Sequence, residues 1–123
     1  MKLLGYQGLD VWKKSMEMAR SVRKVAKLLP QEELYELSSQ IRRAAVSIPS
    51  NIAEGNGRAS TKDYLQFLSI ARGSNYELQT QLQLCVVFEY CTEAEIQEAL
   101  NLSYDVGRML NALIDKLDKT VTR

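Results

Sequence analysis

One apolar stripe constrains the fold of this chain more than any other feature. Its members recur at intervals of three or four residues: Leu34, Leu37, Ile41, Ala45, Ile48 and Ile52. That spacing places them on one face of an α-helix, and the stripe passes Pro49 without losing phase. A proline inside a helix removes one backbone hydrogen bond and crowds the carbonyl four residues earlier. We therefore predict one helix kinked at Pro49 rather than two helices.

Three further segments show the same helical periodicity. No segment long enough for a strand shows the alternation of apolar and polar residues that a strand would have. Leu29-Pro30 separates the first two helices, and Gly55 and Gly57 are expected to end the second through left-handed backbone. Four long amphipathic helices with short connections predict an all-α fold, an antiparallel up-down four-helix bundle forming a single domain over residues 1–123. The predicted helices span residues 10–29, 31–54, 60–89 and 93–119.

The starts of the last two helices carry a specific local signal. Ser60 is followed three residues later by Asp63, and Thr92 is followed three residues later by Glu95. Both pairs have the pattern of a capping box, in which two side chains satisfy the free amides of the first turn. We expect these two helices to begin at those residues.

Composition narrows the functional classes. Among 123 residues there is no histidine, which excludes a histidine general base and the Ser-His or Cys-His nucleophile. Cys85 and Cys91 alone do not make a zinc site, and we expect buried thiols. No apolar run approaches the roughly 18 residues of a membrane span, and no signal peptide is visible. We expect a cytoplasmic, non-catalytic protein with neither metal nor cofactor and no membrane contact.

Charge is unevenly distributed, although the total is only +1. Residues 1–74 hold twelve Lys/Arg and seven Asp/Glu, a net +5, while residues 75–123 hold four and eight, a net −4. Such asymmetry is consistent with an anionic partner for the basic half. It is equally consistent with attraction between basic and acidic helices, within one subunit or between subunits.

The first helix carries the clearest basic feature. At 100° per residue, five cationic side chains fall within roughly 100° of its circumference. This flank is either a solvated face or a stripe that faces an anion. Its members are Lys13, Arg20, Arg23, Lys24 and Lys27.

The third helix has two irregular features. Asn75 interrupts its apolar seam beside Gly73 and Ser74, which indicates a close helix crossing or a feature that fixes pairing specificity. A second apolar row lies off that seam, and we expect it to form a contact between subunits. This row comprises Leu65, Tyr76, Val87 and Phe88.

Three stretches carry a family resemblance: LDVWKKSMEMA (9–19), SSQIRRAAVSIPSNIAEGNGR (38–58) and DYLQFLSIARGSNYEL (63–78). Together they closely resemble the bacterial "four helix bundle protein" family, whose founding members are encoded in intervening sequences of 23S ribosomal RNA genes. The family carries a ribosomal-protein-like label. It is similar to the accessory variability determinant proteins of diversity-generating retroelements, which work with a reverse transcriptase and nucleic acid.

The resemblance implies a four-helix bundle that assembles as a ring-like homopentamer. It also implies that basic residues of the matching stretches could meet RNA. Intersubunit ion pairs are the alternative for some of them, for example Arg43 with Glu54 or Arg72 with Glu77. The residues carried over are Arg42, Arg43, Arg58, Lys62 and Arg72.

Two functional hypotheses follow. The first is a non-catalytic, oligomeric nucleic-acid-binding accessory protein, with structured RNA or ribosomal RNA as its partner, in which symmetry multiplies the basic flank. The alternative is a pentameric protein–protein interaction scaffold or adaptor without direct nucleic-acid contact. A nuclease would need clustered carboxylates, and the acidic residues are scattered over outer helix faces.

Overall fold

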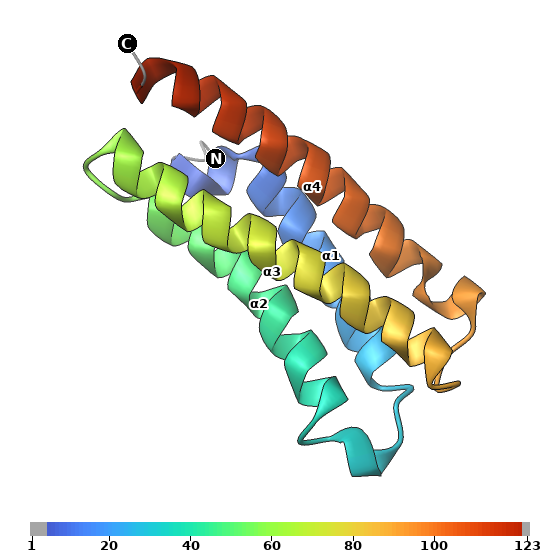
Figure 1. The fold of residues 1–123 in the computed structure, drawn as a ribbon. Coiled ribbons are helices and arrows are strands. Elements are labelled where there is room, and N and C mark those ends of the chain that lie inside the picture. The colour runs from blue at the N-terminus through green and yellow to red at the C-terminus, as the bar shows by residue number, and fades with distance from the viewer. Residues whose placement is uncertain (1–4, 122–123) are drawn as a thin grey trace.

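The protein, described here by a computed structural model over residues 5–121, consists of four long helices and two short 3₁₀ turns (Figure 1). The 3₁₀ turns are η1 (Gly5–Gly8) and η2 (Gln31–Glu33). Each long helix contacts two others: α1 and α3 both pack against α2 and against α4. This all-α arrangement is that of a four-helix bundle, as predicted. The long helices are α1 (Asp10–Ala26), α2 (Leu37–Asn56), α3 (Thr61–Val87) and α4 (Glu93–Val121).

The core is built around the stripe of α2. Ile41, Ile48 and Ile52 have no exposed surface, and they pack in one apolar cluster with residues from the other three helices. The helix is continuous through Pro49, which is itself buried. The kink at this proline stays a prediction.

The second helix begins later than the sequence suggested. Leu34 was expected to open its apolar stripe, but this residue precedes α2 and its side chain is 39% exposed. The chain forms η2 directly after Pro30, and the backbone of Glu36 (φ −117, ψ −105) then departs from helical values. The first helix also ends at Ala26 rather than residue 29. Pro30 has no amide hydrogen to donate to the Ala26 carbonyl four residues earlier, and its ring would clash with that carbonyl in a continued helix.

Gly55 does not end α2 as expected. It is a buried residue within the helix, and Gly57 follows with a right-handed φ of −81°. A Cβ atom on Gly55 would lie 2.7 Å from Cβ of Phe67 on α3. The glycine therefore permits close approach of α3 to α2, and its conformational freedom is not used.

Asn75 marks the crossing of α3 and α4. Its side chain is 1% exposed. The amide Nδ2 donates to the Ser103 carbonyl oxygen at 2.9 Å, and the Ser103 hydroxyl donates to Oδ1 at 2.7 Å. Gly107 lies alongside, and a Cβ there would be 3.3 Å from Nδ2. The buried amide is thus satisfied by one turn of α4, as the interpretation of a close crossing requires.

The predicted capping box at Thr92 is complete, and at Ser60 the N-cap half of the predicted box is present. The Asp63 amide donates to Ser60 Oγ at 3.1 Å, and the Glu95 amide donates to Thr92 Oγ1 at 3.2 Å. The Thr92 amide in turn donates to the Glu95 carboxylate at 2.9 Å. These bonds fix where α3 and α4 begin.

We call the region formed by η2 and the α3–α4 turn (residues 88–92) the loop end. A single carboxylate holds it together: Glu33 accepts the Tyr90 hydroxyl at 2.6 Å and the Leu37 amide at 3.3 Å. This bond to Glu33 raises the pKa of Tyr90 to about 12. Burial beside Cys91 raises the pKa of the Cys85 thiol, also to about 12, and both thiols are free and buried.

The opposite end of α2 leads into the α2–α3 turn, residues 57–60, which we call the turn end. Here Arg58 pairs with Glu54 at 2.7 Å and lies 4.7 Å over the ring of Phe67. Within residues 5–121, no helix is both long enough and apolar enough to cross a membrane.

Candidate nucleic-acid interface

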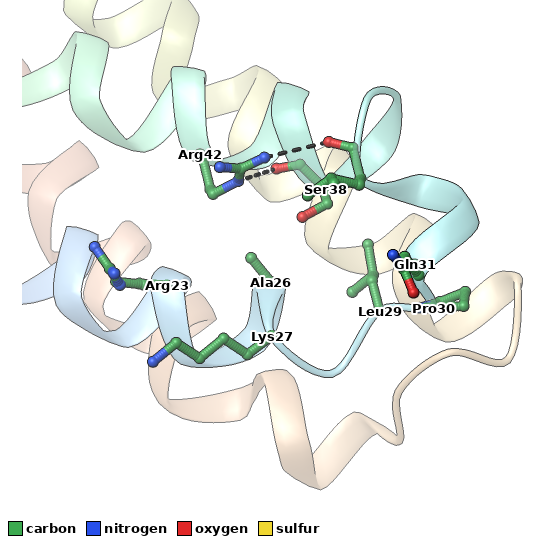
Figure 2. Close-up of a pocket in the computed structure, with 9 residues that line it drawn as sticks. Arg23, Ala26, Lys27, Leu29, Pro30, Gln31, Ser38 and Arg42 are labelled. Atoms are coloured by element: carbon green, nitrogen blue, oxygen red, sulfur yellow. Dashed lines mark hydrogen bonds between the residues drawn. The ribbon is translucent and has the colours of Figure 1, made fainter.

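Two hollows between α1 and α2 form one groove, because Arg23 and Arg42 line both. The first, of about 330 Å³, adjoins η2, with Lys27 on one side and Pro30 at its end (Figure 2). Leu34 also lines it. The second, of about 500 Å³, continues the groove past Arg20 and Val46. We call this the basic groove and define it by Arg20, Arg23, Lys27 and Arg42.

Arg42 has a fixed orientation in the basic groove. Its Nε donates to the Ser38 carbonyl oxygen and its Nη2 donates to the Leu34 carbonyl oxygen, each at 3.2 Å (Figure 2). These bonds satisfy carbonyls in the first turn of α2 and in the segment before it, and they leave Nη1 free to donate. A guanidinium held in this way loses little further side-chain entropy when it binds an anion.

The electrostatics of the basic groove are one-sided. No Asp or Glu lines either hollow, and within the described chain none of its four cationic side chains lies within 4.0 Å of a carboxylate. Four uncompensated cations along one concave surface raise the local concentration of anions. Metal-ligating side chains, by contrast, form no group of three or more anywhere in residues 5–121.

The structure brings together only part of the predicted basic set. Arg43 lines a shallow hollow on the outer ridge of α2, next to Arg42. Lys13 and Lys24 are exposed on α1 without lining the groove. Arg58 and Lys62 lie at or beside the turn end, far along α2 from η2.

Arg72 lies on another side of the bundle. Its Nη1 donates to Asn111 Oδ1 on α4 at 3.2 Å, which places the guanidinium on the α3–α4 side. Within the described chain Glu54 pairs with Arg58. The alternative that Arg43 pairs with Glu54, or Arg72 with Glu77, across a subunit contact stays a prediction, because it involves a second subunit.

The second apolar row of α3 is largely uncovered. Tyr76, Val87 and Phe88 are 57%, 70% and 50% exposed, and Leu65 is half-buried. Val87 lines a groove of about 480 Å³ between α3 and α4, together with Leu100 and Tyr104. This apolar surface is therefore distinct from the basic groove.

Sequence reasoning missed the residues that shape the basic groove. Pro30, Gln31 and Leu34 close it only because η2 interrupts the helix predicted from residue 31. The hydrogen bond between Glu33 and Tyr90 joins residues that are distant in sequence, so no local sequence pattern predicts it.

With this geometry in place, comparison with known proteins is decisive for the family. Residues 7–112 match the family described as 23S rRNA-intervening sequence protein. The chain belongs to the 23S rRNA-intervening sequence protein family. The expected family resemblance is thereby confirmed over most of the chain.

One solved structure similar to this member of the 23S rRNA-intervening sequence protein family supports the same assignment. It is the crystal structure of a protein of unknown function from the S23 ribosomal protein family of Bacteroides thetaiotaomicron. The two are 30% identical and superpose with a TM-score of 0.78, over 85% of this chain and 95% of the other. No curated protein matches the chain. Neither description indicates a catalytic family.

Proposed function

We propose that this protein is a non-catalytic, oligomeric RNA-binding accessory protein of the cytoplasm that holds the RNA backbone in the basic groove. The observation that carries the proposal is the convergence of Arg20, Arg23, Lys27 and Arg42 on one groove that no carboxylate lines. The family name, which refers to 23S rRNA intervening sequences, supports RNA rather than another polyanion.

The physical basis is release of counterions. Each phosphate that a Lys or Arg neutralises frees condensed cations, so affinity falls steeply as salt concentration rises. Arg42 supplies a preoriented donor, while Arg20, Arg23 and Lys27 are long side chains that can follow a backbone of variable shape. A homo-oligomer, a pentamer by family resemblance, would repeat this groove around its axis.

The exposed apolar row supports oligomerisation. A monomer would leave Tyr76, Val87 and Phe88 in water. Val87 also borders the apolar groove between α3 and α4, and exposed apolar surface of this kind can mark an interaction site. These residues lie on α3 and the α3–α4 turn, so a subunit contact there would leave the basic groove between α1 and α2 accessible.

The same surface favours the second candidate function, an oligomeric scaffold without nucleic-acid contact. In that case the apolar α3–α4 groove binds a protein partner, and the basic groove forms a contact with another subunit of the oligomer. The two candidate functions predict different effects when the cations of the basic groove are removed: loss of RNA affinity in the first case, and dissociation of the oligomer in the second.

The test is RNA binding by the full-length protein, measured by filter binding from ~50 mM salt upward. We expect Arg20→Gln with Arg23→Gln to weaken binding and to reduce the log–log salt slope by about 0.7 per lost phosphate contact. The matched control is Lys116→Gln with Lys119→Gln, which removes two exposed cations of α4 and should change binding little.

Light scattering on the same variants separates the candidates. Loss of RNA affinity with an unchanged oligomer supports RNA binding in the basic groove. Dissociation of the oligomer without loss of RNA affinity favours the scaffold. Wild-type binding no tighter than that of an acidic control protein, or insensitive to salt, would overturn the RNA-binding proposal.

A further inference from the structure

A second groove, between α2 and α3, has a different chemistry from the basic groove. It measures about 310 Å³, at the lower end of ligand-pocket volumes. Its residues recur at helical intervals on the facing flanks of the two helices, and all but one are polar. They are Gln40, Arg43, Ala44 and Ser47 of α2, and Ser74, Glu77 and Gln81 of α3. We call this the polar groove.

The serines of the polar groove are already engaged. Ser47 and Ser74 share a hydrogen bond at 3.0 Å, and Asn51 Nδ2 donates to Ser47 Oγ at 3.0 Å. Arg43 and Glu77 are not engaged: neither makes an ion pair within 4.0 Å in the part of the chain that the structure describes. Two opposite charges therefore line one groove without meeting.

Gln81 adds a buried polar side chain to the lining of the polar groove. The residue is only 8% exposed, and its Oε1 is the buried side-chain oxygen or nitrogen within residues 5–121 that has no hydrogen-bond partner.

The donor and acceptor set restricts the chemistry of an occupant. A phosphate would satisfy Arg43 but would be repelled by Glu77, so the polar groove is unsuited to the RNA backbone. Guanine matches both charges. Its N1–H and N2–H₂ donors lie side by side, as a carboxylate requires, and its O6 and N7 accept from an arginine. Uracil offers only one donor on that edge.

Position links the polar groove to the basic groove. Arg42 lines the basic groove, its neighbour Arg43 lines the polar groove, and both border the shallow hollow on the ridge of α2 that separates the two. An RNA strand whose phosphates lie in the basic groove would reach the polar groove by crossing this ridge of α2.

We infer that the polar groove holds an unpaired guanine base of the RNA, with Glu77 accepting from N1–H and N2–H₂ and Arg43 donating to O6 and N7. This inference rests on the proposed function, which supplies the phosphates. It requires a single-stranded segment such as a loop or bulge, because pairing occupies the same base edge in a duplex.

The test uses wild-type protein and chemically defined RNA. Three oligouridine strands of equal length would be compared by fluorescence anisotropy: one with a central guanosine, one with inosine there, and one with uridine only. Inosine lacks the 2-amino group, so it removes one donor without changing charge or shape elsewhere. We expect the guanosine strand to bind roughly ten-fold tighter than the uridine strand, with inosine in between.

Variants then assign the preference to the polar groove. Glu77→Gln and Arg43→Lys should each reduce the guanosine preference to less than about three-fold, while binding of the uridine strand persists. Arg43→Lys keeps the charge and removes only the paired donors. The matched control is Glu98→Gln, an exposed carboxylate on α4 outside the groove, which should retain the full preference.

Each outcome is informative. Salt-dependent binding of all three strands with equal affinity would overturn base recognition and leave the proposed function intact. Absence of RNA binding would overturn both. Dissociation of the oligomer by Glu77→Gln, measured by light scattering, would assign the polar groove to a subunit contact and overturn the inference.

Discussion

The two ends of α2 are held by different forces. At the turn end the contact is steric: Gly55 lets Phe67 approach so closely that a Cβ atom would not fit. At the loop end the contact is polar: one carboxylate, Glu33, accepts from both Tyr90 and the first amide of α2. The comparison teaches that the close approach of α3 to α2 at the turn end depends on shape, with the exposed Arg58–Glu54 pair beside it, whereas the contact at the loop end depends on a titratable hydrogen bond.

Substitutions in the apolar core should destabilise the protein equally at the two ends of α2. They should also have the largest effect on its stability. Ile41 lies toward the loop end and Ile52 toward the turn end, and both are fully buried. Ile41→Ala and Ile52→Ala should each lower the free energy of unfolding by about 2–5 kcal/mol through cavity formation. Urea denaturation monitored by circular dichroism measures this. An unchanged midpoint for Ile41→Ala would mean that the stripe is not core.

The steric character of the turn end is tested at Gly55. Gly55→Ala places a Cβ 2.7 Å from that of Phe67, so α2 and α3 must separate. We expect a loss of about 1–3 kcal/mol in the free energy of unfolding. Gly73→Ala is the matched control, because nothing lies within 4 Å of its Cβ position. That variant should gain up to about 1 kcal/mol from helix propensity. Equal effects of the two substitutions would contradict the packing argument.

The polar character of the loop end is tested by pH. The folded-state pKa of Tyr90, about 12, lies above its ordinary value of about 10. The bond to Glu33 therefore stabilises the fold fully below pH 10, and this contribution is lost as pH rises through 12. Tyr90→Phe should lower Tm at pH 7 by less than Ile41→Ala and should flatten the fall in Tm between pH 10 and 12. Parallel curves for the two proteins would show that the bond contributes nothing.

The smallest effect is expected in the α3–α4 turn. Glu89 has a φ of 64°, in the left-handed region. The Tyr90 and Glu89 amides donate to the Cys85 and Val86 carbonyl oxygens at 2.9 Å each, which is the Schellman pattern. Glycine is the usual residue at this position, so Glu89→Gly should raise the free energy of unfolding by roughly 0.5–1 kcal/mol. The free energy of unfolding is measured by chemical denaturation. If it decreased in Glu89→Gly, the glutamate side chain would have a stabilising contact that the glycine loses.

The sequence predicted most of the architecture, because periodicity and caps are local. The core face of α2 was predicted from the spacing of Ile41, Ile48 and Ile52. The starts of α3 and α4 were predicted from Ser60 and Thr92. The same local reasoning failed for Gly55, whose role depends on where Phe67 lies across the helix interface. It also failed for the start of α2, which was predicted at residue 31. The residues after Pro30 are compatible with a 3₁₀ turn as well as with an α-helix, so the sequence did not show that α2 begins only at Leu37.

The candidate site was less predictable. Lys13, Arg20, Arg23, Lys24 and Lys27 share a flank of α1, but only three of them line the basic groove. Which three depends on how α2 packs against α1, and that is a tertiary property. Glu77 and Gln81 gave no signal, because isolated polar residues on a helix are ordinary until a facing helix completes a groove.

The hydrogen-bonded pair of Asn75 and Ser103 limits how this chain can change length during evolution. An insertion between either residue and the α3–α4 turn would carry one partner out of register and leave a buried amide without its acceptor. The turn connects two residues whose contact is fixed, so length variation is expected to accumulate outside residues 75–103, for example in the segment before α2. A set of homologous chains with gaps scattered through residues 75–103 would argue against this constraint.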